Sequence, residues 1–419
     1  MLLFRTIAFN IMLSFSSKFW IRCSLINLLF VAFLGVVMRY KIGFELPWID
    51  QKHLQHAHSH FAFAGWISQM LMVLIVNFLS PKIQPRIANR FSVVLLLNLV
   101  CAYGMLIAFA MQGYGAVSIF FSTASIFVSF GFTWICFQTL NKPENEHPSN
   151  TWFRAALVFN VLSSLGTFAL AYMMASKHIP QHAYLASVYW YLHFQYNGWF
   201  FFACAGLFIA YLITVFPDFV PPRHTFLLFA GSCIPAYGLS TLWLNLPTWI
   251  YLLIVIGAIA QALGWILFIR ELIRIEFLKK APLSLLGKCL FGVVAIALTI
   301  KLSLQLGSTL PAISKMAFGF RPIVIAYLHL VLLAFTSAFL LSYAYATRLL
   351  VANVWTTLGL IVFVGGIFLN ELVLAMQGIA SLSYHVVPFA NETLFGIALL
   401  MFGGLLVLVY SQFRNQETI

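Results

Sequence analysis

Long runs of hydrophobic residues alternate along the whole chain with short polar segments. Each run is close to the ~20 residues that an α-helix needs to cross the hydrocarbon core of a bilayer. The polar segments contain turn-forming and helix-breaking residues, as in SPKIQPR, NKPENEHPSN and FPDFVPPR. This pattern predicts an all-α polytopic integral membrane protein with about twelve transmembrane helices. The predicted spans are 20–38, 57–79, 91–111, 115–139, 152–174, 187–214, 225–244, 248–269, 285–305, 322–346, 353–375 and 392–411.

The segments between the spans are too short and too apolar to form a separate soluble domain. We therefore expect residues 20–419 to form a single twelve-helix membrane domain. Residues 1–19 place Arg5 and Lys18 among Phe, Leu and Ile, which favours an interfacial N-terminal segment. A cleaved signal peptide is the alternative for this segment.

Composition and charge agree with a membrane protein and add an orientation. Hydrophobic residues make up 62% of the chain and charged residues 8%, which excludes an ordinary soluble domain. With the N-terminus in the cytoplasm, most of the 23 Lys and Arg fall on the inner side, as the positive-inside rule requires. The net charge of +13 thus reflects topology, and we expect a lipid bilayer, not a nucleic acid, as partner. The absence of an organelle-targeting feature favours a bacterial inner (plasma) membrane.

A histidine recurs at matching positions near the predicted outer ends of three helices. The second helix contains HFAFAGW from His60, the sixth HFQYNGW from His193, and the tenth HLVLLAF from His329. This spacing predicts three pseudo-repeats of four helices each. Histidines within a membrane are costly and usually face a cavity, a partner or a metal. The alternative is an imidazole that is hydrogen-bonded between helices or lies at the membrane interface.

Twelve helices with histidines on the second, sixth and tenth resemble subunit I of the haem-copper oxidases and nitric oxide reductases. The resemblance implies that His60 and His329 are the two axial ligands of a low-spin haem, of the b type. It also implies that His193 corresponds to a copper ligand. A bis-histidine haem transfers single electrons without binding oxygen.

The chain departs from this family at its second metal centre. Tyr327 replaces the first histidine of the H-x-H pattern on the tenth helix, and the seventh span lacks the adjacent histidine pair that completes a copper site. No Arg-Arg pair follows for the haem propionates, so Arg321, or with less favourable placement Lys315, is the candidate for that role. Oxygen reduction of the usual type is therefore not expected, and the presence of copper stays open. A five-coordinate haem held by Tyr327, with His193 opposite, is an alternative.

Three further histidines precede His60. On a continuous helix His53, His56 and His60 share one face, whereas His58 points to the other side. His56 is a candidate for binding a metal or a haem propionate, with simple hydrogen bonding as the alternative. The choice of His60 as the haem ligand rests on the shared HFxxxGW frame, so His56 and His58 stay open as ligands.

Three polar residues within other spans also carry expectations. Glu371 is a candidate for a proton relay or an ion site, or else a hydrogen-bonded core carboxyl group. We expect Lys301 to extend its ammonium group to the outer surface, and Gln69 to hydrogen-bond between helices.

The resemblance favours an electron-transfer protein of the haem-copper oxidase superfamily, and it leaves enzymatic activity open. Its partners would be a quinol or cytochrome donor and other oxidase-like subunits. One alternative is a membrane protein that senses or handles haem, copper or nitric oxide without turnover. The other is a transporter, because internal repeats and intramembrane polar residues also occur in transporters.

Overall fold

The computed structural model describes residues 15–314 and 320–414. Every regular element in these two ranges is a helix, and eleven helical stretches are long and apolar enough to cross a membrane. The predicted class, an all-α polytopic membrane protein, is thereby confirmed. Residues 1–14 and Lys315 lie outside the described residues, so of the predicted interfacial segment only the last residues are seen, where α2 begins at Ser17.

The contacts between helices divide the chain into two compact units. Unit 1 comprises the residues up to His147, Ala344–Asn370 and those from Phe389 onward, and unit 2 comprises Pro148–Tyr343 and Glu371–Pro388. Unit 1 contains α2 (Ser17–Gly43), α3 (Gln51–His60), η1 (Phe61–Ser68), α4 (Gln69–Leu79), η2 (Ser80–Lys82), α5 (Pro85–Gln112), α6 (Ala116–Leu140), η3 (Pro143–Asn145) and α18 (Ala390–Phe413). Unit 2 contains α7 (Asn150–Ala175), α8 (Gln181–His193), η4 (Phe194–Phe200), α9 (Phe201–Val215), α10 (Arg223–Ala236), η5 (Tyr237–Thr241), α11 (Thr248–Arg274), α12 (Phe277–Lys280), α13 (Leu285–Gly307), α15 (Arg321–His329) and η6 (Leu330–Ser337). Helices α16 (Ala338–Ala346) and α17 (Val354–Leu382) contain the points where the chain passes between the units.

One predicted span, 225–244, is shorter than the others. It corresponds to α10, which has 14 residues, followed by the 3₁₀ segment η5. Pro235 lies inside α10 near its end, where its ring lacks the N–H that would continue the α-helical hydrogen bonds. The helix therefore tightens into a 3₁₀ turn and misses the length of the other eleven.

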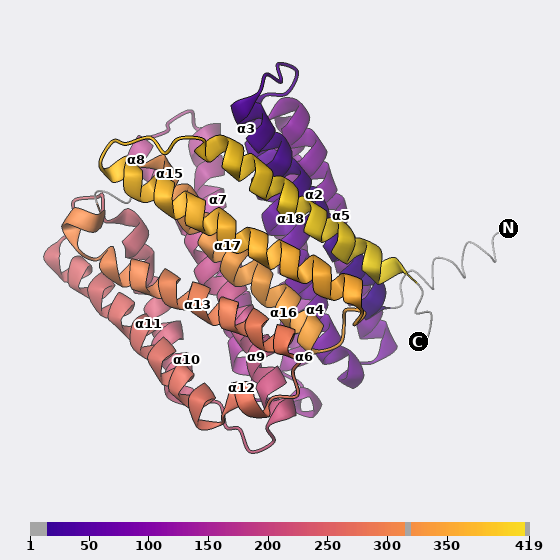
Figure 1. Cartoon of the computed structure of the whole chain (residues 1–419). Coiled ribbons are helices and arrows are strands. Elements are labelled where there is room, and N and C mark those ends of the chain that lie inside the picture. Colours follow the sequence, from indigo (N-terminus) through magenta and orange to yellow (C-terminus); the bar gives the residue numbers. More distant parts are fainter. Residues whose placement is uncertain (1–14, 315–319, 415–419) are drawn as a thin grey trace. The chain divides into compact units, whose positions relative to one another are not determined.

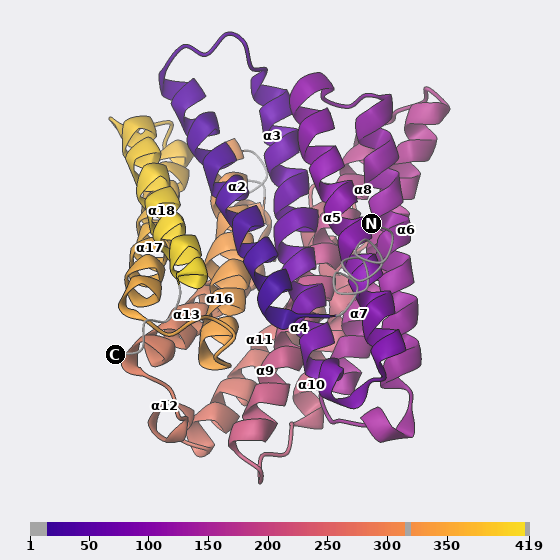
Figure 2. The same cartoon turned by 90° about the vertical axis from the view of Figure 1, so that its right-hand side faces the viewer.

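Helices α17 and α18 approach closely within unit 1 because glycines replace side chains at their crossing. A Cβ atom on Gly404 would lie 2.8 Å from the backbone N of Phe363, and one on Gly359 would lie 2.7 Å from the backbone N of Leu408. Small residues allow this kind of backbone-to-backbone packing in membrane helices. On its other side α18 packs along α2 (Figure 1 and Figure 2).

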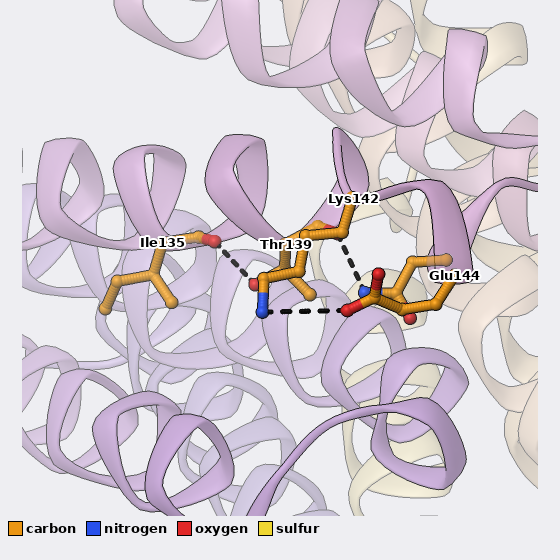
Figure 3. Close-up of polar contacts among 5 residues, drawn as sticks. Ile135, Thr139, Lys142 and Glu144 are labelled. Carbon is orange, nitrogen blue, oxygen red and sulfur yellow. Dashed lines mark hydrogen bonds and ion pairs between the residues drawn. The ribbon is translucent and has the colours of Figure 1, made fainter.

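A buried amide closes the turn that follows α6 in unit 1. Asn145, 2% exposed, donates from Nδ2 to the carbonyl oxygen of Thr139 at 2.9 Å. The neighbouring ion pair between Lys142 and Glu144 spans 3.8 Å, and both side chains are exposed (Figure 3). The turn thus depends on the buried hydrogen bond more than on the ion pair.

These two interactions should respond differently to truncation. Lys142→Ala is expected to change the free energy of unfolding by less than about 1 kcal/mol, since exposed ion pairs contribute little. Asn145→Ala is expected to cost about 1–3 kcal/mol, because it leaves a buried carbonyl without its donor. Thermal unfolding of the two purified variants tests this order, and an equal loss in both would contradict it.

Candidate functional site

Each of the three repeat histidines is the last residue of an α-helix and is followed at once by a π-helix. His60 ends α3 before η1, His193 ends α8 before η4, and His329 ends α15 before η6. In η6 the hydroxyl groups of Thr336 and Ser337 donate to carbonyl oxygens five residues earlier. π-Helical turns are rare and are frequent at functional sites. Sequence reasoning matched the three segments but did not foresee this shared conformation.

The imidazole of His329 is held in one tautomer by its own helix. Its Nδ1 lies 2.9 Å from the carbonyl oxygen of Ile325. A carbonyl oxygen only accepts, so Nδ1 carries the hydrogen and Nε2 carries the lone pair. Metal-binding histidines are commonly fixed in this way, with the other ring nitrogen donating to a backbone carbonyl. The half-buried His329 therefore fits the role of a haem ligand.

The other two predicted residues on α15 lie nearer its start. Arg321 is the first residue of α15 and its side chain is exposed. The ring of Tyr327 lies 6.3 Å from that of Tyr196, edge to face. The roles of Arg321 in propionate binding and of Tyr327 in iron binding remain predictions.

His193 has both ring nitrogens engaged in hydrogen bonds. Its Nε2 lies 2.8 Å from the carbonyl oxygen of Cys233 and must donate to it. Its Nδ1 lies 3.0 Å from Nδ2 of Asn197 and must accept from it. A copper ion at His193 would displace one of these two bonds, and no group of three His, Cys, Asp or Glu in the described ranges has the arrangement of a metal site. His193 as it stands fits the alternative of a structural histidine.

The residues after His193 form a buried polar network that sequence reasoning did not identify. Gln195 donates from Nε2 to Asn160 Oδ1 at 3.0 Å and to Ser163 Oγ at 2.7 Å on α7. His193, Gln195 and Asn197 are all at most 6% exposed. Three polar residues alternating within the apolar run HFQYNGW are the signal that indicates such a network.

The expectation for Lys301 is wrong. Its side chain is 2% exposed, and its Nζ lies 5.7 Å from the centre of the Phe201 ring. It also lies close enough to His193 and Cys233 to interact electrostatically with both. Lys301 is on the face of α13 that packs against η6, so its ammonium group is inside unit 2 and does not reach a surface. The expectation for Gln69 is confirmed, because Asn98 on α5 donates to its Oε1 at 2.8 Å.

The histidines of α3 divide between two faces, as the helical spacing predicts. The ring of His60 stacks on Phe109 with centres 4.2 Å apart, and its Nε2 lies 3.2 Å from the hydroxyl of Tyr114. The His56 ring lies 4.6 Å from that of Tyr114, and its Nε2 is buried without a hydrogen-bond partner among the described residues. His53 lies against Gly113, where a side chain would collide with it.

His58 lies on the opposite face, towards α2. Its Nδ1 is 3.1 Å from the carbonyl oxygen of Val31, which fixes the same tautomer as in His329 and leaves the lone pair on Nε2. His60 instead has Nε2 next to the Tyr114 hydroxyl. The hydrogen-bond pattern typical of metal ligands is thus found at His58, while the sequence frame favours His60.

Asp50 fixes the start of α3 and hence the positions of these histidines. Its carboxylate accepts from the backbone N–H of Lys52 at 2.8 Å and of His53 at 2.9 Å, and this lowers the pKa of Asp50. The stabilisation of the helix start is therefore present above the ordinary pKa of about 3.8 and is lost as the pH falls through the lowered value.

Substitution of Asp50 tests this cap. Asp50→Ala is expected to speed hydrogen exchange at the amides of Lys52 and His53, because both donors lose their acceptor. Asp50→Asn should retain slow exchange, since asparagine also caps helices, but should remove the change in intrinsic-rate-corrected protection between pH 5 and pH 3. Equal exchange in all three proteins would show that the cap does not hold α3.

No protein-family model matches the chain, and no curated protein matches it significantly. What can be said of its function thus rests on the residues and their geometry.

Proposed function

We propose that the chain is a haem-binding membrane protein of the haem-copper oxidase type, in which His329 supplies an axial ligand to a low-spin b-type haem. The hydrogen bond from His329 Nδ1 to Ile325 is the observation that carries this proposal, because it presents the Nε2 lone pair. The second ligand comes from α3, either His60 by the sequence frame or His58 by its tautomer. That one haem joins the two helices rests on the sequence resemblance.

The geometry of His193 supports electron transfer over oxygen reduction. Both of its ring nitrogens are engaged, and Tyr327 stands where the family has a haem ligand. The residues present therefore do not fit a three-histidine copper site. A six-coordinate haem, when bound, supplies reversible one-electron transfer.

The three π-helical turns support the proposed threefold repeat. They follow His60, His193 and His329 at the same place in each helix. A quinol or cytochrome would donate the electrons, in a bacterial inner membrane with the N-terminus in the cytoplasm. Glu371 is a half-buried candidate for a proton relay in this scheme.

Optical spectra of the purified chain test the proposal. Air-oxidised and dithionite-reduced samples should show a sharp reduced α-band, and pyridine haemochrome assay should give one b-type haem per chain. A copper assay is expected to give much less than one copper per chain. A folded, colourless protein would refute the haem proposal.

The saturated His193 also favours a second candidate, a protein that binds haem without turnover. Addition of a short-chain quinol separates the two. Rapid reduction of the haem supports electron transfer, whereas a haem that dithionite reduces and quinol does not would favour sensing or handling of haem.

A further inference from the structure

Unit 2 contains an apolar cavity of about 480 Å³ that none of the predicted haem residues lines. Its walls come from α9, α10, α11, α12, α13 and η6, which lie together in the lower part of Figure 1. The aromatic residues in these walls include Phe201, Phe208, Phe229, Phe291, Phe335 and Phe339. This volume is within the range of ligand pockets, which run from about 300 to 1,000 Å³.

The cavity has a buried end and an exposed end. At the buried end Phe201, Leu298 and Phe335 are at most 6% exposed. At the other end the lining residues Ile273 and Leu278 are 69% and 53% exposed. The cavity therefore opens where α11 ends, at α12 and the start of α13.

Basic residues gather at this open end. The segment 270–288 contains five Lys and Arg against two Glu. Lys279 lines the cavity and is exposed, although it also lies 3.9 Å from Glu276. Lys288 shares a face of α13 with the lining residues Gly292 and Ala295, by its spacing of four and seven residues. No ion pair of Lys288 is found within the described ranges.

The length of the cavity suits a single lipid chain. From Lys288 to Leu298 is about 15 Å along α13, at 1.5 Å per residue. This is half of the roughly 30 Å hydrocarbon thickness of a bilayer, the depth that an acyl chain of one leaflet reaches. Apolar cavities of this kind are unfavourable for water, and an acyl chain matches their aromatic walls.

From these features we infer that the cavity holds an acyl chain of an anionic phospholipid, with the phosphate group at Lys279 and Lys288. Clusters of Lys and Arg next to membrane helices attract anionic lipids of the cytoplasmic leaflet. The positive-inside rule gives this end of the cavity the same leaflet. The site is independent of haem binding and would persist if the proposed function failed.

Gly292 offers a substitution that fills the cavity without disturbing the fold. A side chain at Gly292 meets no atom within 4 Å, and the residue lines the cavity. Gly231 on α10 also has nothing within 4 Å, but it does not line the cavity. Gly292→Leu and Gly231→Leu are therefore a matched pair with the same change of side chain.

Native mass spectrometry of the delipidated full chain, incubated separately with phosphatidylglycerol and phosphatidylcholine of the same acyl chains, tests the inference. The wild type and Gly231→Leu should retain one phosphatidylglycerol, and Gly292→Leu should lose most of it. Lys279→Gln combined with Lys288→Gln should weaken phosphatidylglycerol binding by roughly tenfold or more, with little effect on phosphatidylcholine.

Three results would overturn the inference. One is equal retention of both lipids, which would mean that the headgroup is not recognised. Another is equal loss of phosphatidylglycerol in Gly292→Leu and Gly231→Leu, which would place the lipid outside the cavity. The third is a co-purified quinone, and no phospholipid, that is lost in Gly292→Leu.

Discussion

His329→Ala is expected to remove the reduced α-band from the purified protein, with haem affinity lowered by at least about tenfold. Loss of residues that only orient a metal ligand already costs about 10–100-fold in metal affinity, and loss of the ligand itself should cost no less. Reduced-minus-oxidised spectra and haem content per chain measure the effect.

A histidine outside the helices is the control for this change. His178→Ala, in the exposed segment between α7 and α8, should retain the full band. His329→Gly with imidazole added to the buffer should regain part of the band, since free imidazole can enter the space left by the side chain. An unchanged band in His329→Ala would exclude it as a ligand and leave the histidines of α3 as the only candidates.

The second large effect is expected at the crossing of α17 and α18. Gly404→Leu should destabilise the protein by about 3 kcal/mol or more, because its side chain would collide with the backbone of Phe363 at 2.8 Å. Backbone atoms cannot move aside without separating the two helices. Thermal unfolding followed by size-exclusion chromatography in detergent measures this loss.

The neighbouring glycine gives a control on the same turn of α18. A side chain at Gly403 meets no atom within 4 Å, so Gly403→Leu should change the stability by no more than about 0.5 kcal/mol. If both variants behaved alike, close packing at Gly404 would not be what holds the two helices together.

Hydrophobic runs and turn residues were sufficient to predict the helices. Ten of the predicted spans agree with the observed stretches because a run of about 20 apolar residues has few alternatives to a spanning helix. The eleventh, 187–214, lies inside the longer stretch Gln181–Val215, since the polar turn His182–Tyr184 continues the helix. The span at α10 differs because a single proline changes the type of helix while leaving the hydropathy unaltered.

Side-chain roles were harder to predict than the helices. The two faces of α3 followed from helical spacing, and the structure confirms them for His58 and His60. Spacing could not show that Cys233 and Asn197 occupy both nitrogens of His193, because these bonds depend on packing between distant segments. The same holds for Lys301, whose burial is decided by its neighbours and not by its distance from the end of a span.

The wide turn that follows each repeat histidine has a consequence for insertions and deletions. A π-helical turn holds one residue more than the α-helical turn that it interrupts. Deletion of one residue from η6 would let the segment close into an α-helix, and it would rotate His329 by about 100° relative to α16. The direction in which this imidazole points is thus set by the number of residues in the segment as well as by their identity. A one-residue deletion there should be as damaging to ligand binding as the removal of the histidine itself.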